Sequence, residues 1–85
     1  MQPIAPPKLV IAVVGAAHEL ARHKRLPYYV AVADVMERLQ IGEREKVEEA
    51  IQYAVDRDLL RAGGGWPPRS IVITAEGLEY IGQHR

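Results

Sequence analysis

Apolar residues recur with helical spacing in four stretches of the chain, and three shorter apolar runs are typical of strands. The clearest helical stretch is 43–58, where apolar side chains return every third or fourth residue. Its predicted core face consists of Val47, Ala50, Ile51, Ala54, Val55 and Leu59. Glutamates in the first turn favour the positive end of a helix dipole. We therefore predict a helix over 43–58 that leads directly into a strand over 59–62.

The first helical stretch is apolar almost all round in its first half. We predict a helix over 7–23, with a stripe formed by Leu9, Ala12, Val13, Ala16, Ala17, Leu20 and Ala21. Two interpretations stay open. The helix is buried on most sides by its own domain, or Val10 and Val14 belong to a homodimer seam, because an exposed aliphatic face commonly marks a partner. Residues 1–7 contain three prolines and are expected to be a tail before a single domain, 8–85.

The middle of the chain predicts a very short strand followed by a second helix. Pro27 disfavours helical conformation at the residue before it, and the tyrosines and valine of 28–30 suit a strand. The helix is expected over 31–39, with an apolar stripe of Val32, Val35, Met36 and Leu39. In the turn 40–42, we expect Gly42 to take a left-handed or cap conformation and Ile41 to fill the corner between the helices.

The last third of the chain predicts a hairpin and a final helix. The loop 63–69 holds three glycines and two prolines, which favour a wide turn. A β-branched strand over 71–73 follows, and Thr74 is expected to cap a helix over 75–83 that Leu78 and Ile81 dock. The fold class is therefore α+β and mostly helical.

The distribution of charge along the chain says more about possible partners than the total charge does. The 85 residues carry 11 basic and 11 acidic side chains, a formal net charge of zero, which gives no bulk attraction to nucleic acid or to anionic membranes. Residues 1–29 have a net charge of +3, whereas 42–58 have six acidic and three basic residues, a net charge of −3. We expect a basic end on the first helix and an acidic third helix.

Several classes of protein are disfavoured. Absence of cysteine excludes disulfides and thiolate metal sites and fits the cytoplasm, where we expect the protein. The apolar run 9–17 is too short to span a bilayer, and a signal peptide is disfavoured because the preceding segment is proline-rich and weakly basic. A metal site is disfavoured around His18, Glu19 and His23, because Glu19 and His23 are one helical turn apart but no further ligand follows at a suitable spacing. The sequence also contains no nucleophile motif and no phosphate loop. We therefore expect that the protein is not an enzyme and that it binds no metal and no cofactor.

Three local runs resemble a known family. DVMERLQI at 34–41, YAVDRDLLR at 53–61 and ITAEGLEYI at 73–81 resemble the second helix, the end of the third helix and the close of the wing in winged helix-turn-helix domains. These are the domains of the MarR and PadR types of bacterial transcription regulator. The resemblance implies a three-helix core, a small antiparallel β-hairpin wing and a C-terminal helix. It also implies that the third helix enters a DNA major groove.

Carried onto this chain, the resemblance places DNA-facing positions on the third helix and the wing. The expected contacts to double-stranded DNA are Arg44, Gln52, Arg61 and Arg69, helped by Lys24 and Arg25. The acidity of the third helix departs from the family, because duplex DNA carries one negative charge per roughly 1.7 Å of its axis. The alternative function is therefore a protein-interaction module that docks a partner through Glu48 and Glu49 or through Trp66. An exposed tryptophan is a frequent interface anchor, although Trp66 packed back onto the strands is equally open.

Overall fold

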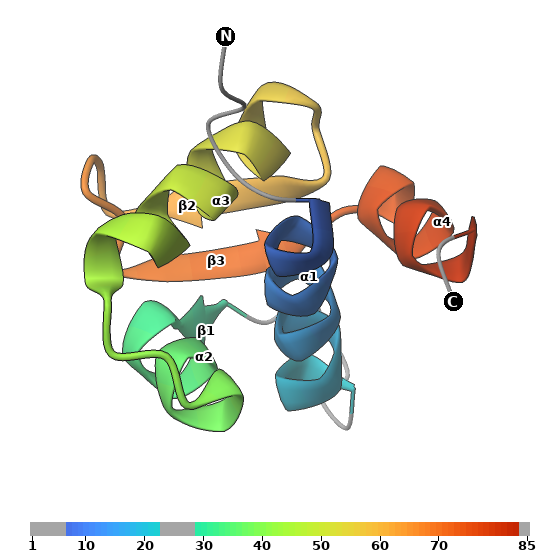
Figure 1. Ribbon diagram of the computed structural model, residues 1–85. Helices are drawn as coiled ribbons and strands as arrows, with labels where there is room; N and C mark the ends of the chain where they lie inside the picture. Colours follow the sequence, from blue (N-terminus) through green and yellow to red (C-terminus); the bar gives the residue numbers. More distant parts are fainter. Residues whose placement is uncertain (1–6, 23–28, 84–85) are drawn as a thin grey trace, which may run out of the picture.

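Three short strands form one antiparallel sheet in the order β1–β3–β2, and helices cover it in the computed structural model of the chain (Figure 1). The structure describes residues 7–22 and 29–83. Within these stretches the elements are α1 (Pro7–Ala21), β1 (Val30–Ala31), α2 (Val32–Leu39), α3 (Arg44–Asp56), β2 (Leu60–Gly63), β3 (Ser70–Ile73) and α4 (Ala75–Gln83). The α+β class, the order of elements and the bounds of the last helix agree with the sequence predictions.

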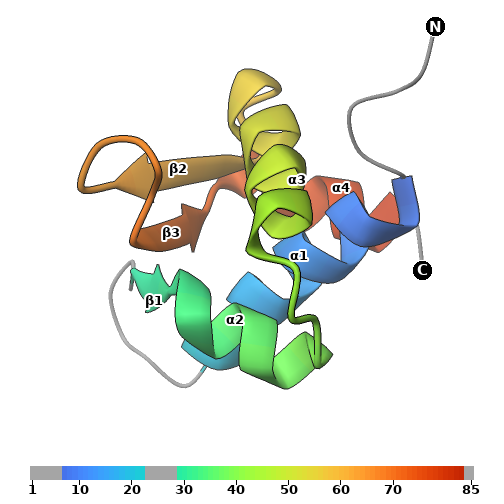
Figure 2. The same ribbon diagram turned by 60° about the vertical axis from the view of Figure 1, so that its left-hand side comes forward.

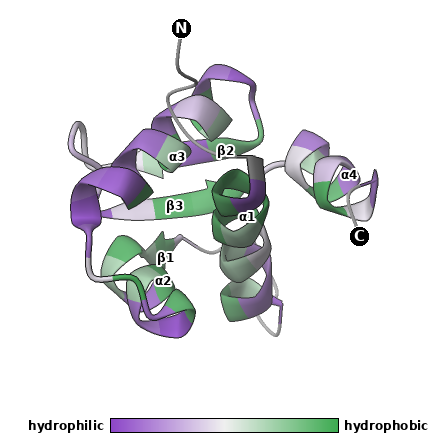
Figure 3. Cartoon of the chain, in the orientation of Figure 1, coloured by the Kyte–Doolittle hydropathy of each residue, from purple (hydrophilic) through white to green (hydrophobic). Residues whose placement is uncertain are grey.

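The helix α1 lies at the centre of the molecule. It packs against α2, α3, α4 and the sheet, and in Figure 3 most of α1 and β3 is hydrophobic while the first turns of α3 are hydrophilic. Val10, Val13 and Val14 are fully buried in this core with Ile51 and Ile71. The burial of α1 agrees with the first interpretation of this helix, and Val10 and Val14 have no exposed surface to offer to the homodimer seam of the second. The apolar circumference of α1 reflects neighbours within the chain on several sides.

The short strand that was predicted before the second helix is part of the sheet, where it pairs with the second strand of the hairpin. Val30 pairs with Ile71 and Ala31 with Ser70, while Leu60 pairs with Ile73 across the hairpin. Because Ala31 belongs to β1, α2 begins one residue later than predicted, at Val32. β2 likewise begins at Leu60 and not at 59, and α1 ends at Ala21, two residues before the predicted end.

Both α2 and α3 end in a left-handed residue that the sequence analysis did not identify. Gln40 has φ 56° and ψ 42°, and Ile41 donates its N–H to the Met36 carbonyl at 3.0 Å, which is the Schellman arrangement. The prediction that Gly42 would take this conformation is wrong. Ile41 packs against the core, as predicted.

The third helix stops two residues before the predicted Asp58 for the same reason. Asp58 has φ 62° and donates its N–H to Val55, while the Leu59 N–H bonds the Ala54 carbonyl at 2.8 Å. Leu59, just beyond the turn, is buried. This turn sends the chain from α3 into β2.

Thr74 joins the end of α3 to the start of α4. Its hydroxyl accepts a hydrogen bond from the Gly77 N–H at 3.0 Å and donates one to the Asp58 carbonyl at 2.5 Å, and its own N–H donates to the Leu59 carbonyl at 3.2 Å. The predicted cap is confirmed. Ile81 docks α4 as predicted, but Leu78 remains 45% exposed, so its predicted docking role is wrong.

Candidate binding groove between α3 and the β2–β3 loop

One face of α3 presents a polar stripe to the loop that connects β2 and β3. Positions 45, 48, 49 and 52 follow the i, i+3, i+4, i+7 spacing of a single helical face. The core stripe Val47, Ala50, Ile51 and Ala54 is buried on the opposite side. The same periodicity that anchors α3 in the core therefore gathers its glutamates on one exposed side.

The β2–β3 loop, Gly64–Arg69, turns the chain back beside this face. Figure 2 shows the loop extending from the ends of β2 and β3, away from α1 and α4. Gly64 and Gly65 adopt φ values of 82° and 84°, a region that residues with a Cβ rarely occupy. Pro68 is buried and fixes the returning end of the loop. Trp66, between these anchors, keeps 54% of its surface exposed, which favours the exposed-anchor interpretation of this residue.

A groove of about 420 Å³ lies between the helix and the loop, lined by Glu45, Glu48, Glu49, Gln52 and Trp66. We call it the α3–Trp66 groove. Its volume lies within the range of about 300–1,000 Å³ typical of ligand sites. The groove is open to solvent, so it suits a segment laid along the surface better than an enclosed small molecule.

The basic residues of this region are already engaged inside the chain. Arg44 Nε lies 2.9 Å from Glu48 Oε2, and Lys46 Nζ lies 3.3 Å from Glu43 Oε1. The Arg57 guanidinium stands 3.6 Å from the centroid of the Tyr53 ring. Within residues 7–22 and 29–83, the side chains of Glu45 and Glu49 make no hydrogen bond or ion pair. Two carboxylates of the groove are thus left uncompensated.

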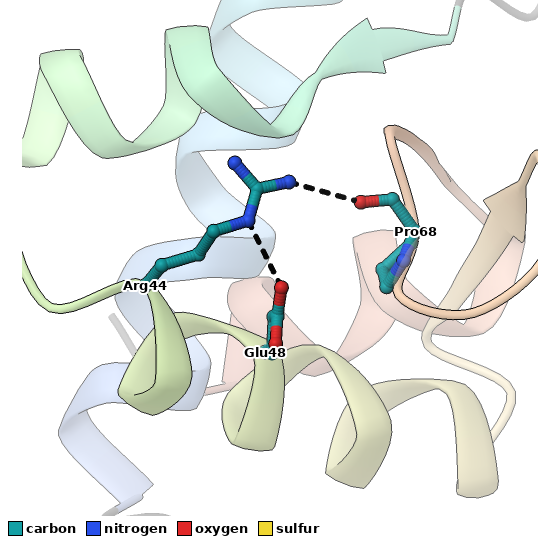
Figure 4. Close-up of polar contacts among 3 residues, drawn as sticks. All are labelled: Arg44, Glu48 and Pro68. Atoms are coloured by element: carbon teal, nitrogen blue, oxygen red, sulfur yellow. Dashed lines mark hydrogen bonds and ion pairs between the residues drawn. The ribbon is translucent and has the colours of Figure 1, made fainter.

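Arg44 connects α3 to the loop. Its Nη2 donates to the Pro68 carbonyl at 3.4 Å while its Nε is bound by Glu48, and Figure 4 shows the guanidinium between the two. Gln52, another predicted DNA contact, donates its side-chain N–H to Asp56 Oδ1 at 2.7 Å. Both side chains make contacts within the chain that a DNA contact would have to share or replace.

The other predicted contacts lie elsewhere. Arg61 on β2 and Arg69 at the end of the loop are exposed, do not line the groove, and have no side-chain partner in the described part of the chain. Lys24 and Arg25 lie outside the described residues. The structure therefore brings together the predicted interaction residues Glu48, Glu49 and Trp66 in one groove, whose lining does not include Arg61 or Arg69.

Two contributors were not among the protein-docking residues predicted from the sequence. Glu45 lines the groove, and its position one helical turn before Glu49 was a signal that could have identified it. The carbonyl of Pro68 carried no such signal, because any residue offers a backbone acceptor and only the path of the loop aims this one at Arg44.

The remaining chemistry of the surface is sparse. Among the described residues, no group of three or more histidine, cysteine, aspartate or glutamate side chains could hold a metal ion. The hydrogen bond from Arg22 lowers the pKa of the Glu19 carboxyl, but this pair lies at the C-terminal end of α1 and does not line the groove. No helix in the described stretches combines the length and apolarity that a membrane span needs.

Comparison with protein-family models, with curated proteins and with solved structures gives no match to this chain.

Proposed function

We propose that this chain is a protein-interaction module that binds a basic segment of a partner protein in the α3–Trp66 groove. The observation that supports the proposal is the meeting of three glutamates with a half-exposed tryptophan in one groove. Aromatic residues dominate the binding energy of protein interfaces. Complementary charge around such an anchor raises the rate of association and excludes partners of the wrong sign.

The charges oppose the use of the same face on nucleic acid. A helix that enters a major groove approaches phosphates on both sides. Here α3 would bring with it the carboxylates of Glu45 and Glu49, which have no partner among the described residues. The groove contains three carboxylates, and the guanidinium of Arg44 is already bound to Glu48. A cationic partner removes this repulsion between like charges, whereas a polyanion increases it.

The test is a titration with a short basic peptide, followed by the fluorescence of Trp66, the only tryptophan of the chain. We expect a saturable change that weakens as salt is added, because exposed ion pairs are screened. Replacing both Glu45 and Glu49 by glutamine should weaken binding by about two- to thirtyfold, since exposed pairs contribute roughly 0.2–1 kcal/mol each.

The matched control carries the same change of charge on another helix. Glu76 and Glu79 are exposed on α4, outside the groove. Their double replacement by glutamine removes two negative charges and should leave the affinity almost unchanged. Equal weakening by the two double variants would show that binding follows total charge, and no saturable signal with the parent chain would refute the proposed function.

A second candidate function is that of a winged-helix DNA-binding protein, a transcription regulator. It is supported by the order of the elements, which matches the resemblance, and by Arg61 and Arg69, which are exposed and unpaired in the described part of the chain. The affinity for duplex DNA should then fall steeply with salt, and loss of each arginine should reduce the slope by about one unit. In the same assay, the Glu45 and Glu49 double variant should bind DNA more tightly than the parent chain.

A further inference from the structure

We infer that the α3–Trp66 groove selects arginine over lysine in the segment that it binds. This inference rests on the proposed function and adds the identity of the recognised side chain. It is drawn from the chemistry of the groove wall, which combines an indole ring, three carboxylates and the amide of Gln52.

The indole favours a planar cation. Trp66 is 54% exposed and lines the same groove as the three glutamates, so its ring is available to a cation that the carboxylates attract. Tryptophan is the best aromatic partner for a cation, and a guanidinium stacks on an aromatic ring in addition to the charge attraction. An ammonium group is compact and strongly hydrated, so in an open groove it keeps much of its water.

The carboxylates offer acceptors at a spacing that one guanidinium can share. Glu45 and Glu49 lie one helical turn apart on the same face, and neither has a partner among the residues that the structure describes. A guanidinium carries five N–H donors in a fixed plane and can bond a carboxylate while its face stays on a ring. The three N–H donors of lysine share one nitrogen atom. An ammonium group therefore has no flat face to stack on the ring while it bonds two separate carboxylates.

The chain itself already binds a guanidinium at the edge of this groove. Arg44 donates to the Glu48 carboxylate at 2.9 Å and to the Pro68 carbonyl at 3.4 Å. Figure 4 shows the group between helix and loop, bound by one acceptor from each. An arginine from a partner would meet the same kind of carboxylate acceptor in Glu45 and Glu49, on the same face of α3. This contact shows that a guanidinium fits against both α3 and the loop.

Two peptides test this inference. They have the same length and spacing and differ only in carrying arginine or lysine, and each is titrated into the full chain by calorimetry. We expect the arginine peptide to bind about tenfold more tightly, which corresponds to ~1.4 kcal/mol. Trp66→Leu should abolish most of this preference, and Trp66→Phe should retain part of it, because a phenyl ring still stacks.

The outcomes separate the inference from the proposed function. If both peptides bind the parent chain equally and Glu45→Gln with Glu49→Gln weakens both, the groove binds basic segments and the preference for arginine is refuted. If neither peptide binds, the proposed function itself fails. A preference that persists unchanged in Trp66→Leu would also overturn the inference, since the indole would then play no part in it.

Discussion

Gly77 is the residue whose replacement tests the architecture most sharply. It lies in the first turn of α4, where its backbone passes the end of α3. A Cβ added to Gly77 would lie 2.3 Å from the Leu59 carbonyl oxygen and 2.7 Å from Cγ1 of Ile73. The first of these is a backbone atom that already accepts a hydrogen bond from Thr74. This backbone carbonyl cannot rotate away, so alanine would force α4 away from the α3–β2 turn.

Helix propensity and packing predict opposite signs for Gly77→Ala. Propensity alone favours alanine by about 0.5–1 kcal/mol in a helix. Overpacking typically costs about 1–3 kcal/mol, and contact with fixed backbone places this case near the upper end. We expect a net loss of about 2–3 kcal/mol out of a total stability of about 5–15 kcal/mol. For a domain of this size, that lowers Tm by on the order of 10–20 °C.

The assay is thermal and urea denaturation followed by helical circular dichroism. Gly15→Ala is the control, because Gly15 lies inside α1 and a Cβ there would meet no heavy atom within 4 Å. That variant should be slightly more stable than the parent chain. If Gly77→Ala matched or exceeded the stability of Gly15→Ala, the close approach of α4 to Leu59 would be refuted.

Three further changes probe the same framework. Thr74→Val removes the hydroxyl that caps α4 and bonds the Asp58 carbonyl; it should lower the free energy of unfolding by about 1–2 kcal/mol in urea denaturation, and Thr74→Ser should recover most of the loss. Asp58→Gly should match or exceed the parent stability in the same assay, while Asp58→Val should cost ~1–2 kcal/mol, because φ at this position is 62°. Arg22 lowers the pKa of Glu19, so this pair stabilises the fold above the ordinary carboxyl pKa and loses its effect as the pH falls through the lowered value. Glu19 is solvent-exposed, so Glu19→Gln should produce only a small difference in stability at neutral pH and none at strongly acidic pH; a large difference would contradict this reasoning.

The order of elements could be predicted from the sequence because it depends on local periodicity. The stripe of α3 and the cap at Thr74 are set by residues close together in the chain, and both were predicted correctly. The helix ends were less accurate. Gln40 and Asp58 take the left-handed positions because the path of the chain requires a turn there, and preference for glycine is too weak to decide such a position.

The predictions that were not confirmed or stayed open concern packing between segments that are distant in the sequence. An apolar helix such as α1 has the same pattern whether its neighbours belong to its own chain or to a second copy, so the burial of Val10 and Val14 could not be read from periodicity. The exposure of Trp66 depends on where the loop rests against α3. The bond from Arg44 to Pro68, which joins residues 24 positions apart, reports that placement.

The most direct test of the proposed groove is an NMR titration of the isotopically labelled full chain with the arginine peptide and, separately, with duplex DNA. We predict that the peptide shifts the indole N–H of Trp66 and the amides of 45–52, and leaves those of Arg61 and Arg69 unchanged. DNA should shift none of the groove signals. The opposite result, with peptide silent and DNA shifting the α3 amides together with Arg61 and Arg69, would contradict the account and favour the DNA-binding function.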